Sequence, residues 1–157
     1  MMTFEELLDR DGHLVYRTRG VSMEPMLRQD RDLVMISVPS SRLKKYDVAL
    51  YKRGDSYVLH RVIGVKEDRY LIRGDNTYSI EEVPFEAVIG VLTGFQRKGR
   101  EYTVTNNFYQ FYAKFWNFIY PLRAGFIILK RVAVSTARKL GILPFLKMLF
   151  SPLRKWR

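Results

Sequence analysis

The sequence predicts a mainly β protein, in which a compact antiparallel β domain, coiled or folded into a partial barrel, is followed by a basic α-helical region. Short runs rich in Val, Ile, Leu and Tyr recur over residues 13–105, with turn-forming residues between them. Beyond them the apolar spacing becomes that of a helix, and no acidic residue follows Glu101. We therefore expect a β domain over residues 1–105 and a helical region over residues 106–157.

The predicted β domain begins with one short helix and continues with seven strands. Thr3 and Glu6 have the spacing of a capping box at the start of FEELLD, which predicts the helix. The strands are predicted at HLVYRT, DLVMISV, DVALYKR, YVLHRVIGV, RYLIRG, VIGVLTGF and EYTVT, which start at residues 13, 32, 47, 57, 69, 88 and 101. The length of 157 residues suits one such core, and the absence of cysteine excludes disulfides, thiolate metal sites and cysteine catalysis.

The helical region is first aromatic and then basic. Eight of the 13 residues in 108–120 are aromatic, and the apolar residues follow a spacing of three and four. This spacing predicts a helix, which Pro121 interrupts. A second helix is expected over about 122–140, with Gly141 and Pro144 at its end.

The net charge of +11 is concentrated in this region. Residues 102–157 hold ten of the 27 basic residues and none of the 16 acidic ones. Aromatic side chains favour the membrane interface and basic ones favour anionic headgroups, so we expect residues 108–157 to bind an anionic membrane surface. The alternative is that residues 108–120 pack on the β domain. Nucleic acid is disfavoured, because the aromatic residues do not interleave with most of the charge.

The expected membrane association is peripheral. No stretch of about 18 uncharged apolar residues occurs in the chain, and no anchor-like segment precedes the stretch at 20–27. The side of the membrane is left open, because a basic tail suits the cytoplasmic leaflet whereas leader peptides are removed on the other side.

The stretch GVSMEPML at residues 20–27 contains a single serine. Ser22 is either the cap of a short helix that begins at Glu24 and Pro25, or a nucleophile. Taken alone, the stretch favours the cap, because cap serines far outnumber catalytic ones.

Two later segments change this interpretation. In order along the chain, GVSMEPML at 20–27, LHRVIGV at 59–65 and RGDN at 73–76 resemble the nucleophile, base and glycine-aspartate boxes of signal peptidase I and its serine-peptidase relatives. The resemblance covers about residues 14–95 and implies a β domain of the LexA and signal-peptidase type. It implies that Ser22 is the nucleophile and His60 the general base. A histidine at the base position resembles the archaeal and endoplasmic-reticulum enzymes rather than those with lysine.

A histidine base works best when a carboxylate orients it. Asp75 in the RGDN box is the first candidate, and Glu81 stands about where Ser-His relatives carry a second acid. The sequence does not choose between the two. His60 itself titrates near neutral pH and needs no large pKa shift to accept a proton.

The residues around Ser22 have supporting roles in this interpretation. The backbone N–H of Ser22 is the natural donor to an oxyanion. Gly20, where leader peptidases often have a serine, lets the substrate backbone come close. Met23 is expected to pack beneath the nucleophile turn, and Pro25 to fix that turn.

The function predicted from the sequence is that of a serine endopeptidase, which cleaves a leader or signal peptide from a precursor through a Ser-His mechanism. It requires a peptide or precursor-protein substrate and no cofactor or metal. The resemblance implies an extended substrate with small side chains near the cleaved bond. A catalytically inactive binding module at a membrane surface is the alternative. A self-cleaving regulator of the LexA type is less favoured, because the base is not lysine and only 19 residues precede the nucleophile box.

Overall fold

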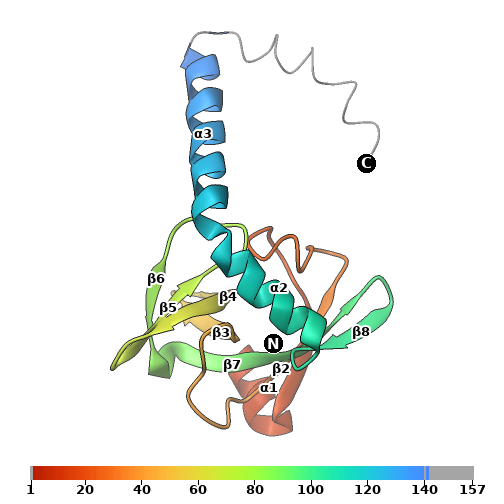
Figure 1. Ribbon diagram of the computed structural model, residues 1–157. Coiled ribbons are helices and arrows are strands. Elements are labelled where there is room, and N and C mark those ends of the chain that lie inside the picture. Colours follow the sequence, from red (N-terminus) through yellow and green to blue (C-terminus); the bar gives the residue numbers. More distant parts are fainter. Residues whose placement is uncertain (1, 140, 142–157) are drawn as a thin grey trace. The chain divides into compact units, whose positions relative to one another are not determined.

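The computed structural model describes residues 2–139 and 141 (Figure 1). The chain divides into two compact units, residues 1–118 and 119–157. The first unit is an open, eight-stranded antiparallel sheet with helices α1 (Phe4–Asp11) and α2 (Asn107–Phe118). The predicted class, a mainly antiparallel β domain with helices toward the C-terminus, is confirmed.

The sheet has the strand order β1-β2-β7-β3-β4-β5-β6, and β8 pairs with β7. All neighbouring strands are antiparallel. The seven predicted strands are all present, with ends that shift by one or two residues at several positions. The strands are β1 (His13–Arg17), β2 (Leu33–Ser37), β3 (Val48–Arg53), β4 (Ser56–Val65), β5 (Arg69–Arg73), β6 (Glu81–Pro84), β7 (Val88–Arg97) and β8 (Arg100–Thr103).

Strand β6 is the element that the sequence did not predict. Its residues EEVP include two charged side chains and a proline, which are unusual in strands. It forms the end of the sheet and pairs with β5, and a short 3₁₀ turn at Phe85–Ala87 connects it to β7. A proline is tolerated at such an edge, because its missing N–H leaves no ladder bond unmade there.

Helix α1 forms as its capping box predicts. The Thr3 hydroxyl accepts a hydrogen bond from the backbone of Glu6, and the Glu6 carboxylate accepts one from the backbone of Thr3. Gly12 ends the helix at a φ of 73°, in the left-handed region that glycine adopts readily. Leu8 is buried and joins the helix to the core of the sheet.

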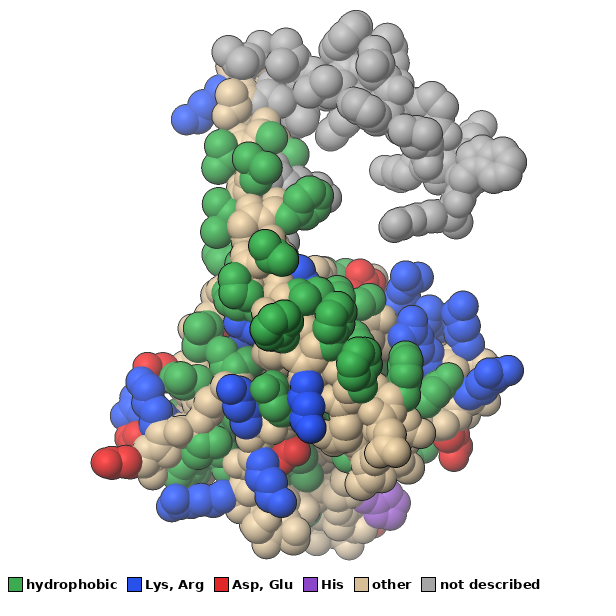
Figure 2. Space-filling view, in the orientation of Figure 1, with side chains coloured by type: hydrophobic (Ala, Val, Ile, Leu, Met, Phe, Trp, Pro, Cys, Tyr) green, Lys and Arg blue, Asp and Glu red, His purple; other side chains and the backbone are tan. Residues whose placement is uncertain are grey.

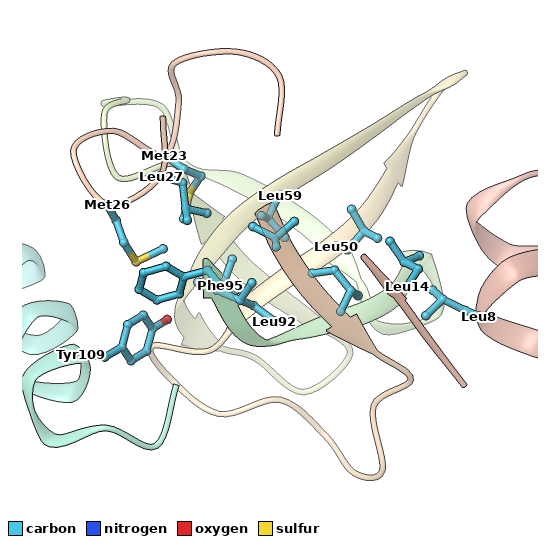
Figure 3. Close-up of a cluster of buried hydrophobic side chains, with 13 residues drawn as sticks. Leu8, Leu14, Met23, Met26, Leu27, Leu50, Leu59, Leu92, Phe95 and Tyr109 are labelled. Atoms are coloured by element: carbon cyan, nitrogen blue, oxygen red, sulfur yellow. The ribbon is translucent and has the colours of Figure 1, made fainter. Parts of the chain in front are cut away.

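Helix α2 packs against the sheet, as Figure 1 shows. Tyr109 and Ala113 are buried, and the Tyr109 ring lies 5.9 Å from that of Phe95 on β7. Figure 3 shows these two rings beside Met26 in the largest cluster of buried apolar side chains. The first compact unit therefore ends at Phe118 and not at residue 105, because one face of α2 belongs to its core.

Helix α3 (Tyr120–Lys139) belongs to the second unit. It starts after a break at Ile119 and has Pro121 in its first turn, so the interruption that the sequence predicts at Pro121 occurs two residues earlier. Among the described residues, no helix is both long and apolar enough to cross a membrane. Pro144 and the last basic residues of the predicted tail lie outside the described residues.

Candidate functional site

An open cavity of about 880 Å³ lies on one face of the first unit. Several of the residues singled out in the sequence line it, namely Gly20, Ser22, Met23, His60 and Glu81. Asp75 and Pro25 are not among the lining residues. The cavity therefore brings together the proposed nucleophile, the proposed base and one of the two candidate acids.

Ser22 lies in the loop between β1 and β2, in a series of turns. The backbone of Leu27 donates to the carbonyl of Met23 at 3.0 Å, but this helix-like bond is not continued. The short helix expected at Glu24 and Pro25 does not form, and the Glu24–Pro25 peptide bond is cis. Met23 is buried in the main core cluster, as expected for a residue beneath this loop.

The glycine at position 20 adopts a conformation that few other residues reach. Its φ is 84°, and its N–H donates to the side-chain oxygen of Gln29 at 3.0 Å. A side chain at this position would be strained. Gly20 therefore sets the path of the backbone before Ser22, and it places no side chain beside Ser22.

The Ser22 loop is tied to the turn after β5. The carbonyl of Ser22 accepts from the backbone N–H of Asn76 at 2.7 Å, and the Asn76 side chain donates to the carbonyl of Val21 at 3.2 Å. A Cβ on Gly74 would lie 2.7 Å from the Ser22 carbonyl oxygen and 3.0 Å from Nε2 of His60. The three sequence boxes thus meet at Gly74, where only a glycine fits without displacement.

His60 lies in the middle of β4 and is 5% exposed. Its Nδ1 is 3.2 Å from the Tyr51 hydroxyl and 3.4 Å from Oε1 of Glu81. The Tyr51 hydroxyl donates its one hydrogen to Oε2 of Glu81 at 2.9 Å, so it can only accept from His60. We therefore assign the proton of neutral His60 to Nδ1, which leaves the lone pair on Nε2.

Nε2 of His60 is accessible from the cavity. Among the described residues, every buried side-chain nitrogen or oxygen has a hydrogen-bond partner. Nε2 has no such partner there, so it is in contact with solvent. The Ser22 hydroxyl and His60 also form no hydrogen bond with each other in the described part of the chain, an arrangement that unliganded hydrolases often show.

Burial lowers the pKa of His60 below its ordinary value of 6.5. The nearby carboxylate of Glu81 opposes this effect, because it stabilises the protonated ring. The ring is therefore neutral at pH 7 and can accept a proton, and a carboxylate is in place to stabilise the charge that results.

Asp75 lies in a different network. Its two carboxylate oxygens each accept from Arg61 at 2.8 Å, and the Tyr112 hydroxyl donates to Oδ2 at 3.1 Å. Burial alone would lower the pKa of Arg61, but Asp75 and Tyr109 together outweigh this effect and the pKa is raised. Of the two acids that the sequence left open, Glu81 contacts His60 and Asp75 is paired with Arg61.

Helix α2 completes this second network. The indole N–H of Trp116 donates to the carbonyl of Asp75 at 2.9 Å, and Arg61 donates to the Tyr109 hydroxyl at 3.1 Å. Arg61 is fully buried. These contacts hold Asp75, and with it the turn that bonds to Ser22.

Tyr51 is the residue of the site that sequence reasoning missed. It lies in the predicted strand DVALYKR, where a tyrosine is indistinguishable from an ordinary core residue. No motif includes it. The described residues also contain no group of three or more His, Asp or Glu side chains placed to hold a metal ion.

Comparisons with known proteins do not assign the chain to a family. No family model matches it, and no curated protein matches it either. The functional argument therefore depends on the motif boxes and on the geometry of the cavity.

Proposed function

We propose that the protein is a serine endopeptidase of the signal-peptidase-like type, with Ser22 as nucleophile, His60 as general base and Glu81 as the acid that orients His60. The observation that supports it most is the position of His60. Its Nε2 reaches the cavity that Ser22 also lines, while Glu81 and Tyr51 hold Nδ1 on the other side of the ring. Nucleophilic serine catalysis needs a histidine with one nitrogen free to accept the serine proton and the other held by hydrogen bonds.

The proposed reaction has two halves. The Ser22 oxygen forms a bond to the carbonyl carbon of the substrate while its proton passes to Nε2 of His60, and the Ser22 N–H donates to the oxyanion. The carbon–nitrogen bond then breaks, and His60 returns the proton to the leaving amine. Water then attacks the carbonyl carbon of the acyl-enzyme and gives a proton to His60. The bond between this carbon and the Ser22 oxygen breaks, His60 returns the proton to the Ser22 oxygen, and the acid is released. In both halves Glu81 stabilises the protonated imidazole.

A serine-directed fluorophosphonate probe tests this proposal. The probe should modify Ser22, and His60→Gln should abolish the modification. Ser56 and Ser79 line the same cavity, so Ser56→Ala and Ser79→Ala are the matched controls and should be labelled like the wild type. If Ser22 stays unmodified at every pH, the protein is a binding module of peptidase-like shape and not an enzyme.

We also propose that α2 places the protein at an anionic membrane surface. The outer face of α2 carries four phenylalanines that are 46–83% exposed, and Figure 2 shows hydrophobic side chains gathered over this helix. They are Phe108, Phe111, Phe115 and Phe118. Their spacing of three and four places them on one stripe, which Lys114 flanks. The stripe is suited to the interface, and the ten basic residues after Glu101 are suited to anionic headgroups.

Substitution of two phenylalanines tests the membrane proposal in the full chain. Truncation before α2 would also uncover Arg61 and Asp75, so it would confuse binding with folding. We expect Phe111→Ser/Phe115→Ser to bind vesicles of anionic phospholipid at least about tenfold more weakly, since each buried phenylalanine contributes roughly 1.5–3 kcal/mol when fully transferred. Val65→Ser changes an exposed apolar residue of the sheet and serves as the control. Equal sedimentation of the double variant and the wild type would refute the proposal.

A further inference from the structure

The charged side chains that line the cavity carry a net positive charge. Three arginines line it, Arg17, Arg19 and Arg53, and Glu81 is the one acidic residue among the described lining residues. Their formal charges sum to +2 when His60 is neutral. An open cavity with this lining attracts negative groups.

The single carboxylate is already occupied. Glu81 accepts from the Tyr51 hydroxyl at 2.9 Å and from Nη1 of Arg53 at 3.2 Å, and it contacts His60. Arg53 is thus the arginine whose charge is matched within the cavity. The positive charge that remains belongs to Arg17 and Arg19.

Arg17 and Arg19 have no carboxylate partner among the described residues. Arg17 donates to the backbone carbonyl of Asp30 at 3.2 Å, which satisfies one N–H and leaves the charge unmatched. Arg19 makes no hydrogen bond or ion pair in the described part of the chain. Arg17 is the last residue of β1, and Arg19 lies two residues after it and three residues before Ser22.

We infer that the cavity binds an extended peptide that carries a carboxylate side chain near the bond to be cleaved, and that Arg17 and Arg19 recognise this carboxylate. Guanidinium groups pair with carboxylates through two parallel hydrogen bonds, which adds geometric selectivity to the charge attraction. The inference rests on the proposed function for the choice of a peptide as the ligand. It adds an acidic position to a substrate otherwise expected to have small side chains.

Peptide binding to the inert Ser22→Ala variant of the full chain measures this preference without cleavage. The probes are short fluorescent peptides of small residues, in which one position at a time carries Asp or the isosteric Asn. At one position or more, the Asp peptide should bind about fivefold more tightly at low salt, which is the size of effect expected from partly exposed ion pairs. Added salt should reduce the difference, since screening weakens exposed pairs.

Arginine variants locate the effect. In the Ser22→Ala background, Arg19→Gln and Arg17→Gln should each reduce the preference for Asp. Arg100→Gln removes the same charge from an exposed position on β8 outside the cavity and should leave the preference unchanged.

Three results would overturn the inference. They are equal binding of Asp and Asn peptides at every position, no measurable binding of any Asp peptide, and an equal loss of preference in Arg100→Gln. Cleavage of the same peptides by the wild-type chain is a separate measurement. Selective binding without cleavage would count against the peptidase proposal and would leave the recognition of the carboxylate by Arg17 and Arg19 standing.

Discussion

Two consecutive residues of β4, His60 and Arg61, point to opposite faces of the sheet and form two very different sites. Both are almost fully buried, and both have a carboxylate partner. On the Arg61 face, α2 covers the ion pair with Asp75 and leaves it no open side. On the His60 face, Nε2 has no hydrogen-bond partner within the described part of the chain, and the residue lines a cavity. The two sites are therefore alike in burial. They differ in that one ring nitrogen of His60 is left able to accept a proton.

The largest expected effect separates chemistry from folding on the His60 face. His60→Gln removes the proposed base and should lower the rate of peptide hydrolysis by about 10⁶, as loss of the catalytic histidine does in a serine peptidase. The free energy of unfolding, measured in urea, should change far less than it does when the Arg61 face is disrupted. The other histidine, His13, is exposed and outside the cavity, so His13→Gln is the control and should retain activity.

Disruption of the Arg61 face should have the opposite result. Asp75→Asn leaves the buried charge of Arg61 without its partner, which costs about 3–5 kcal/mol in comparable buried pairs. Urea unfolding measures the loss directly. Asp68→Asn changes a carboxylate that is paired with Arg69 but exposed, so it should have little effect on the free energy of unfolding. A similar small cost for Asp75→Asn would show that the two faces do not differ as described.

The Glu81 carboxylate should act through the pKa of His60. Burial holds this pKa below 6.5, so the acid limb of kcat/KM should have its midpoint below pH 6.5. Glu81→Gln removes a carboxylate that raises the pKa of His60, so the limb should shift to lower pH. The rate should also fall, by up to about 10⁴-fold, because His60 loses the acid that orients it. Proton NMR of the imidazole reports the same shift without activity, with His13 as an internal reference. An acid limb that moves to higher pH in Glu81→Gln would contradict the assigned role.

The same lowered pKa has a consequence for stability. His60 is neutral in the fold at a pH where the unfolded chain, with a pKa near 6.5, already binds a proton. Its contribution to stability is therefore fully present above pH 6.5 and is lost as the pH falls through the pKa of the folded state.

The smallest expected effect concerns the helix that covers the Arg61 face. Trp116→Phe keeps the aromatic ring but removes the hydrogen bond to the carbonyl of Asp75. The free energy of unfolding should fall by about 1 kcal/mol, the typical contribution of one such bond. Phe115→Tyr on the exposed face of the same helix is the control and should have no measurable effect, since Phe115 is 46% exposed. An unchanged stability in Trp116→Phe would mean that α2 does not hold Asp75 through this bond.

Local patterns were sufficient for most of the secondary structure. The capping box at Thr3 and Glu6, the apolar runs of seven strands and the break near Pro121 all correspond to observed elements. Strand β6 was not predictable, because EEVP has no strand signature and becomes a strand through its pairing with β5. The helix expected after Ser22 was also absent. A capping pattern marks where a helix can start, but a helix forms only if successive residues add further i→i+4 hydrogen bonds, and in the described loop after Ser22 only one such bond forms.

The sequence singled out Ser22, His60, Asp75 and Glu81 as the residues to compare, through the resemblance of three ordered boxes to those of signal peptidases. It could not decide which acid faces His60. That depends on sheet register, which sets Tyr51 and Glu81, 30 residues apart, within hydrogen-bond distance on the same face as His60. It also depends on α2, whose packing commits Asp75 to Arg61. The alternation of side chains along β4 predicts that His60 and Arg61 lie on opposite faces, but not which face stays open. That is decided by contacts between segments distant in the sequence, which form only when the chain folds.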